Sequence, residues 1–155
     1  MVWATRAGQL PVGFRPVKLS VKSDYAARAV LGLVRSYAAG SARKVEDLAA
    51  EQGIPANYLV QILIELKANQ LVRSTRGKDG GYRLARPPGE ITLGDVLRAM
   101  HGEVVDPPAL GDSRCAHELR EAWGRFKLAV EQAADGLNFQ AIFEQAGDRD
   151  KMYYI

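Results

Sequence analysis

The sequence has 155 residues, of which 47% are hydrophobic and 25% are charged, and it contains one cysteine. This length fits one domain, or one domain with an appended oligomerisation element, that buries a hydrophobic core. A single cysteine excludes an internal disulfide framework and a four-thiolate zinc or iron–sulfur site within one chain. No apolar run approaches the roughly 20 residues that span a bilayer, and residues 1–10 lack the apolar core of a signal peptide. We therefore expect a cytoplasmic protein that does not bind a membrane.

The formal net charge of +3 is unevenly distributed along the chain. Residues 1–89 contain 14 Lys and Arg against 6 Asp and Glu, whereas residues 90–155 contain 7 against 12. A basic N-terminal part joined to an acidic C-terminal part is typical of a polyanion-binding module linked to a different functional element. Chance clustering of solvated surface charge gives the same pattern, so charge alone does not decide for nucleic acid.

Residues 1–16 contain two prolines, two glycines, two arginines and no acidic residue, which predicts a flexible N-terminal extension. Two alternatives stay open. Translation starts at Val17, so that the extension is a wrongly assigned start, or the segment is a mitochondrial transit peptide, although it is not clearly amphipathic.

Three predicted helices follow. Ser23 is expected to cap the first helix, which extends to Tyr37. The second and third helices cover residues 45–52 and 55–69, and Gly53 between them can adopt the positive φ of a tight turn. The buried stripe of the third helix has the spacing i, i+3, i+4, i+7 and consists of Leu59, Ile62, Leu63 and Leu66. Two short helices joined by a tight turn are a helix-turn-helix candidate.

The apolar period changes to two over residues 71–75 and 82–86, which predicts two strands joined by a glycine-rich turn. Thr92 and Asp95 then resemble a capping box that opens a helix over residues 93–101. A helix, a helix-turn-helix and a basic hairpin together describe a winged helix-turn-helix. The predicted fold class is therefore mainly α with a small β-hairpin, and the winged domain is expected to cover residues 17–102.

After a predicted loop over residues 103–114, a long helical pattern runs from Cys115 to about Asp135. A short helix and a tail over residues 148–155 complete the chain, so the helical C-terminal region is expected over 115–147. Apolar residues recur in the long helix at alternating spacings of three and four, which is the seam of a helix that packs against a partner. Its predicted dimerisation residues are Leu119, Trp123, Phe126 and Val130. A small-molecule cavity around the aromatic residues is the alternative.

The third helix carries a second, polar face opposite its buried stripe. This face includes Asn57, Tyr58, Val60 and Gln61. Asparagine and glutamine can pair bidentately with adenine in the major groove, a tyrosine hydroxyl can bind a phosphate, and a valine can contact a thymine methyl group. A polar solvated helix face is the alternative for this helix taken alone.

The predicted hairpin is strongly basic. Asp79 alone opposes five cations, which are Arg73, Arg76, Lys78, Arg83 and Arg86. A cationic loop beside a recognition helix suits the DNA backbone or the minor groove, where phosphate charge is dense. We assign Arg76, Lys78 and Tyr82 of the wing to DNA and expect Lys22 and Arg28 of the first helix to hold flanking phosphates. A solvated charged hairpin is the alternative.

Six segments carry a family resemblance: Lys18-Leu19-Ser20, Tyr25-Ala26, Tyr58–Leu63, Leu71–Gly77, Gly80–Ala85 and Glu90–Val96. Together they resemble the IscR/NsrR/CymR (Rrf-type) family of bacterial transcription regulators, from about Val17 to the C-terminus, and the wing is the most specific part. The resemblance implies a homodimer with winged heads, a long dimerisation helix and a palindromic operator. It also implies that Asn57, Tyr58, Val60, Gln61 and Arg76 face DNA.

Members of that family that hold an iron–sulfur cluster have three spaced cysteines in the loop before the long helix. Here only Cys115 lies in that neighbourhood, and the family's spacing leads back to Ala109 and Glu103. Because such clusters need thiolates, we expect no cluster, no other cofactor and no metal. Cys115 lies beside Arg114 and near a helix N-terminus, which can favour a redox-sensing thiolate. A buried, inert cysteine is the alternative.

These features predict a dimeric, sequence-specific DNA-binding regulator, a repressor, that senses redox through its cysteine or responds to a small molecule or protein. Two-fold symmetry predicts half-sites one or two helical turns apart. The alternative function is a winged-helix module that docks another protein through its acidic half. The sequence has no HExxH, CxxC or triad-like element, so we do not expect an enzyme.

Overall fold

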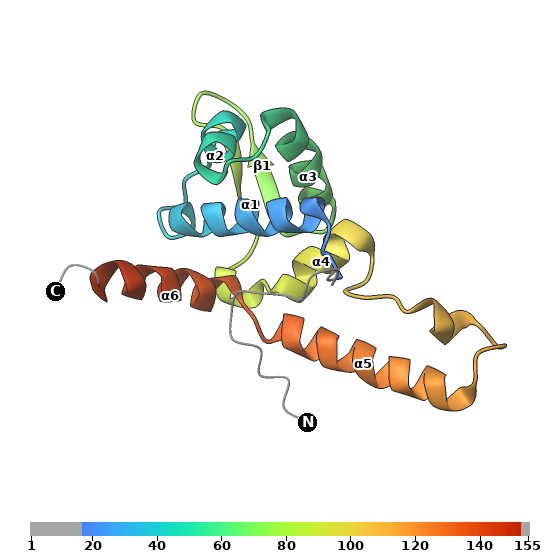
Figure 1. The fold of residues 1–155 in the computed structure, drawn as a ribbon. Coiled ribbons are helices and arrows are strands. Elements are labelled where there is room, and N and C mark those ends of the chain that lie inside the picture. Colours follow the sequence, from blue (N-terminus) through green and yellow to red (C-terminus); the bar gives the residue numbers. More distant parts are fainter. Residues whose placement is uncertain (1–16, 153–155) are drawn as a thin grey trace, which may run out of the picture.

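The computed structural model describes residues 17–152, and the predictions made for residues 1–16 lie outside this range. The helices are α1 (Val21–Tyr37), α2 (Val45–Gln52), α3 (Ala56–Ala68), α4 (Leu93–His101), α5 (His117–Asp135) and α6 (Phe139–Met152). The strands are β1 (Val72–Thr75) and β2 (Gly81–Leu84), and short 3-10 turns cover Pro88–Glu90 and Pro108–Gly111. Figure 1 shows α1, α2, α3, the hairpin and α4 gathered into one head, with α5 and α6 extending from its lower side in opposite directions. None of the described helices is long and apolar enough to cross a membrane.

The core of the head is made where α1 packs against α2 and α3. The predicted stripe of α3 is fully buried there, together with side chains such as Leu33 and Leu48. Each buried leucine stabilises the head by about 1.5–3 kcal/mol relative to an exposed one. Gly32 of α1 permits the close approach of α2, because a Cβ at this position would lie 2.6 Å from Cδ1 of Leu48.

Local signals place most helix ends correctly, but the start of α1 is earlier than predicted. Ser20 is the N-cap of α1, since its side-chain oxygen accepts from the backbone N–H of Ser23. Ser23, the predicted cap, is instead buried in the first turn, where its hydroxyl lies 2.7 Å from Nε2 of His101. Two serines three residues apart both match a cap, and tertiary burial decides between them. The capping box of Thr92 and Asp95 is confirmed.

The hairpin is an antiparallel pair whose register joins Val72 to Leu84 and Thr75 to Gly81, so both strands lie within a residue or two of the predicted ranges. A further isolated bridge joins the hairpin to the connection between α1 and α2. The N–H of Arg43 donates to the carbonyl of Tyr82 at 2.7 Å, and the N–H of Tyr82 donates back at 2.8 Å. The wing is thus fixed to the helix-turn-helix by backbone hydrogen bonds.

The C-terminal elements correct two boundaries. Helix α5 begins at His117 with Ala116 as its N-cap, so Cys115 precedes the helix instead of opening it. Helix α6 continues to Met152, so the prediction of a short helix followed by a tail from residue 148 is wrong. No proline interrupts this segment, and its Gly147 is tolerated inside the helix at a modest cost in stability. Residues 153–155 lie outside the described part.

The bridge between wing and helix-turn-helix makes Gly81 irreplaceable. Its φ of +145° is a glycine conformation, and a Cβ would lie 2.2 Å from the carbonyl oxygen of Arg43. We expect Gly81→Ala to lower the free energy of unfolding by about 2 kcal/mol or more, measured by urea denaturation. Gly147→Ala is the control, because a Cβ there meets nothing within 4 Å. Equal stability of the two variants would contradict the role given to Gly81.

Candidate nucleic-acid interface

The outer face of α3 presents the polar side chains that the sequence assigns to bases. Asn57 and Gln61 are exposed, and Val60 beside them is half-buried. Tyr58 is 38% exposed and packs edge-to-face on Tyr25 of α1, with ring centroids 5.7 Å apart. This packing fixes the direction of the Tyr58 ring while its exposed part stays open to a ligand. The structure therefore brings these four side chains together on one end of α3.

The wing contributes two exposed cations to the candidate interface. Arg76 and Lys78 are exposed in the turn between β1 and β2. Tyr82, the third wing residue assigned to DNA, is half-buried and packs against the hydrophobic core. Its backbone holds the bridge to Arg43, so Tyr82 has a structural task that the sequence did not reveal.

The pattern of ion pairs separates the head's cations into two groups. Among residues 17–148, seven cations of the head have no carboxylate within 4 Å, and these are Lys18, Lys44, Lys67, Arg73, Arg76, Lys78 and Arg83. By contrast, Lys22 binds Glu65 at 2.6 Å and Arg28 binds Asp24 at 2.8 Å. The two predicted phosphate contacts on α1 are thus already paired within the chain. The cations free to bind an external anion concentrate on the wing and its surroundings.

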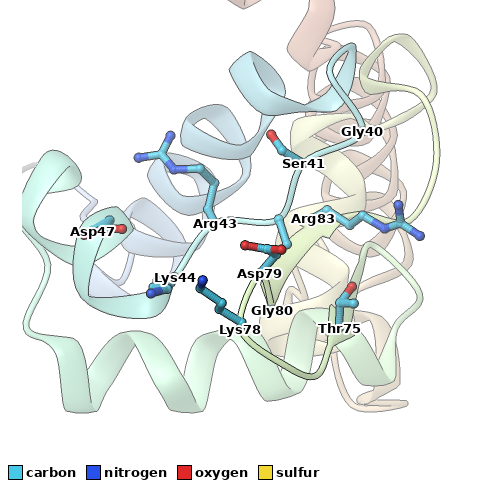
Figure 2. A pocket seen from close by; sticks show the side chains of 11 residues that line it. Gly40, Ser41, Arg43, Lys44, Asp47, Thr75, Lys78, Asp79, Gly80 and Arg83 are labelled. Atoms are coloured by element: carbon cyan, nitrogen blue, oxygen red, sulfur yellow. The ribbon is translucent and has the colours of Figure 1, made fainter.

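A groove of about 640 Å³ lies between the wing and the connection from α1 to α2. Figure 2 shows Lys44 and Lys78 reaching toward the same part of this groove from opposite sides. Arg83 also lines the groove, and so do Asp47 and Asp79, which make no ion pair with these cations. The groove is therefore lined by cations from separate elements of the head.

Sequence reasoning did not assign Lys44 or Arg83 to the site. Arg83 was visible as a hairpin cation, but Lys44 lies outside the wing, in the N-cap position of α2. Its approach to the wing depends on the backbone bridge at Arg43, next to it in the chain. The usable signal was its position immediately before the first helix of the helix-turn-helix, where a helix N-terminus attracts anions.

Arg43 itself is turned away from the groove. Its guanidinium donates to Oε2 of Glu51 at 2.5 Å, and Figure 2 shows the side chain pointing toward α2. This hydrogen bond lowers the pKa of Glu51 below its ordinary value of 4.5, against a smaller opposing effect of burial. This ion pair fixes the side chain of Arg43, and the backbone of Arg43 is hydrogen-bonded to Tyr82 of the wing.

A separate apolar surface lies on α5. Leu119, Trp123 and Phe126 of the predicted seam are 50%, 38% and 49% exposed, and Val130 is half-buried. The rings of Trp123 and Phe126 meet edge-to-face with centroids 5.6 Å apart. Ala134 is the sole residue of α5 that is buried within the described chain. This apolar face is therefore open in the single chain.

A helix-turn-helix with an adjacent basic wing defines a winged-helix DNA-binding protein, and solved structures agree. T. potens IscR superposes with a TM-score of 0.71 at 27% identity, covering 84% of this chain and 88% of that one. CymR, the global cysteine regulator of B. subtilis, superposes with a TM-score of 0.72 at 26% sequence identity. The superposition covers 84% of this chain and 98% of CymR.

Residues 19–145 match Rrf2, described as an iron-dependent transcriptional regulator. A protein of Mycobacterium tuberculosis H37Rv with the name "Putative HTH-type transcriptional regulator Rv1287" is 46% identical over 124 residues, which cover 77% of this chain and 76% of the relative. The chain belongs to the Rrf2 family of DNA-binding transcriptional regulators, which are not enzymes. The resemblance seen in the sequence is confirmed.

The donor groups of this chain do not fit the iron–sulfur cluster that cluster-binding family members hold. At the three positions indicated by the family's spacing, Glu103 forms an ion pair with Lys127, Ala109 lies in a 3-10 turn, and Cys115 supplies the single thiol. No group of three His, Cys, Asp or Glu side chains suited to a metal ion occurs among the described residues. An iron–sulfur cluster needs several thiolates, so one chain offers too few.

The pair of Arg43 and Glu51 makes stability depend on pH. Because the pKa of Glu51 is lowered on folding, its stabilising effect is complete above pH 4.5 and is lost as the pH falls through the lower folded-state pKa. We expect Glu51→Gln to be less stable than wild type at neutral pH, by up to about 1 kcal/mol for this partly exposed pair. The difference should shrink as the pH falls from about 5 to about 3, measured by urea unfolding at each pH.

The control for this experiment is Glu46→Gln, which removes a carboxylate of the same helix that has no ion pair within the described residues. It should not reproduce the loss of stability at neutral pH. A gap between Glu51→Gln and wild type that stays constant down to pH 3 would contradict the assignment.

Proposed function

We propose that the protein is a homodimeric, sequence-specific repressor that grips duplex DNA with two winged heads. The observation that carries this proposal is the group of head cations without a carboxylate partner among the described residues, most of which lie on the hairpin or beside it at Lys44. Neutralising DNA phosphates with such cations releases counterions, which drives binding. Repression follows if the bound dimer occludes a promoter.

The two parts of the head have different tasks in this proposal. Asn57 and Gln61 on α3 read base edges in the major groove, because carboxamide groups can pair bidentately with adenine. Arg76 at the tip of the wing enters the neighbouring minor groove, where the potential is most negative. Lys44 and Lys78 hold backbone phosphates on either side of the groove in Figure 2.

The open face of α5 is the proposed dimer interface. Its apolar residues follow the spacing of helices that pack nearly parallel or antiparallel, and aromatic side chains of this kind are enriched in interfaces. A second copy of the chain supplies the same face by two-fold symmetry. Pairing two heads in this way matches a palindromic operator.

The proposed dimer works without an iron–sulfur cluster, since each chain supplies one thiol and such a cluster needs several thiolates. Cys115 is half-buried, directly before α5, and its N–H donates to the carbonyl of Asp112. Oxidation of this thiol is one proposed signal, because a change there acts at the N-terminus of the dimerisation helix. Binding of a small molecule or a protein partner is the other.

The wing assignment predicts that Arg76→Ala weakens binding. We expect the dissociation constant for a duplex selected from a random-sequence library to rise about tenfold or more at fixed salt, because a charge-assisted contact is lost. The slope of log affinity against log salt should fall by about one. Fluorescence anisotropy over a salt series measures both quantities.

Arg114→Ala is the matched control, because it removes the same charge from the exposed loop before α5. It should change neither the affinity nor the salt slope appreciably. Wild-type binding by Arg76→Ala would remove the wing from the interface, whereas failure of the wild type to bind any duplex would favour the protein-docking alternative.

The dimer assignment predicts that a charge on the apolar face separates the chains. Phe126→Asp should shift the protein from dimer to monomer in sedimentation velocity, since burying an unpaired carboxylate is strongly unfavourable. Gln132→Asp adds the same charge to an exposed position on the opposite side of α5 and should remain dimeric. A wild-type protein that is already monomeric at micromolar concentration would contradict the interface.

A further inference from the structure

We infer that Arg98 of α4 is a positioning residue: its forked hydrogen bonds to Asp135 fix the direction of α5 relative to the winged head and thereby set the operator half-site spacing. This inference rests on the proposed dimeric DNA binding and adds to it a determinant of specificity outside the DNA-binding surface.

Helix α5 is attached to the head mainly at its C-terminal end. Ala134, in the last turn, is its buried residue within the described chain. Just beyond the helix, the N–H of Leu93 donates to the carbonyl of Leu137 at 2.9 Å, and the N–H of Phe139 donates to the carbonyl of Ile91 at 3.0 Å. Figure 1 shows the rest of α5 extending beyond the head from this end.

Because α5 is held at one end, a small rotation there produces a large displacement at its other end. With 19 residues, α5 is about 28 Å long, so a rotation of about 10° at its attached end displaces the far end by about 5 Å. The ion pair of Lys127 and Glu103 braces α5 only against the loop that leads into it, not against the head. Something at the attached end must therefore set the angle.

Arg98 is built for this task. Its Nη1 donates to Oδ1 of Asp135 at 2.8 Å and its Nη2 donates to Oδ2 at 2.7 Å. Two parallel hydrogen bonds fix the relative orientation of the two planar groups as well as their separation. The Asp135 carboxylate lies over the first turn of α4, where a Cβ on Gly94 would come within 1.9 Å of Oδ1. The absence of a side chain at Gly94 admits this contact.

The same guanidinium belongs to a longer chain of charges that reaches the wing. Asp95 lies 4.0 Å from Arg98 and also accepts from the backbone N–H of Thr92 in the capping box. Arg86, two residues beyond β2, donates to Asp95 at 3.2 Å. Alternating charges thus link the exit of the wing, the start of α4 and the end of α5.

This linkage orients more than it stabilises. The side chains of Arg98 and Asp135 are 37% and 46% exposed, and partly exposed pairs add little to the free energy of unfolding. The hydrogen bonds nevertheless lower the pKa of Asp135, so the carboxylate stays charged and the fork stays intact at neutral pH. Loss of the fork should leave a folded, dimeric protein whose heads are less well aligned.

The consequence for DNA follows from the length of α5. In a symmetric dimer the direction of α5 sets the distance between the two α3 helices, and neighbouring base pairs are about 3.4 Å apart along the duplex. A displacement of about 5 Å therefore spans one to two base pairs. If the angle between α5 and the head is fixed, the dimer binds operators with one half-site spacing. If this angle varies, the dimer binds operators with several spacings.

The test compares wild type with Arg98→Met, which keeps the aliphatic volume but removes the fork, and with Asp135→Asn, which weakens it from the other side. Duplexes carry the operator selected by the wild type, with one or two base pairs added or removed between half-sites. We expect the wild-type affinity to fall about tenfold or more at altered spacings and that of both variants to fall less than about threefold. Arg114→Met, which removes a similar fork to Asp112 within one loop, should behave as wild type.

A second measurement keeps the inference testable if a variant binds no DNA. Spin labels on Glu46→Cys in a Cys115→Ser background report the distance between the two heads, and Arg98→Met should broaden its distribution. Unchanged spacing preference, or an unchanged distance distribution in a folded dimer, would overturn the role of Arg98. A wild type that dimerises but selects no duplex, while Arg98→Met broadens the distance distribution, would refute the proposed function and retain the orienting role.

Discussion

Backbone pairing between Arg43 and Tyr82 is the interaction on which the arrangement of the head depends. A two-stranded hairpin alone is marginally stable in water, and this pair of hydrogen bonds joins it to the connection between α1 and α2. Gly81 lets the two backbones approach closely. As a result, Lys44 before α2 and Lys78 in the wing border one groove. The basic surface is thus assembled from elements that no local sequence signal brings together.

Local chemistry explains what the sequence could predict. The bounds of α2 and α4 follow from apolar periodicity and from the capping box of Thr92 and Asp95, which act within one helical turn. The predicted cap of α1 was wrong because Ser20 and Ser23 are equally good caps locally, and only the burial of Ser23 in the folded head distinguishes them. The cations of the wing were visible from composition. The groove beside them and the fork to Asp135 were not, because both join residues far apart in the chain.

The C-terminal part of this chain differs from that of cluster-binding family members in its number of thiols. Its single thiol leaves the connection before α5 without the ligands of an iron–sulfur cluster, although the family is described as iron-dependent. This chain has an open apolar face on α5 and a forked ion pair that joins α5 to α4. Membership of the Rrf2 family thus fixes the architecture, while the residues of this chain decide which signal can act through it.

In the proposed complex, two copies of this chain bind one duplex through their basic heads. The most direct measurement is the mass of the complex with a selected duplex, determined by sedimentation velocity or light scattering at moderate salt. Two chains per duplex, dissociating as salt is added, is the predicted result. One chain per duplex, or no complex at any salt concentration, would contradict it.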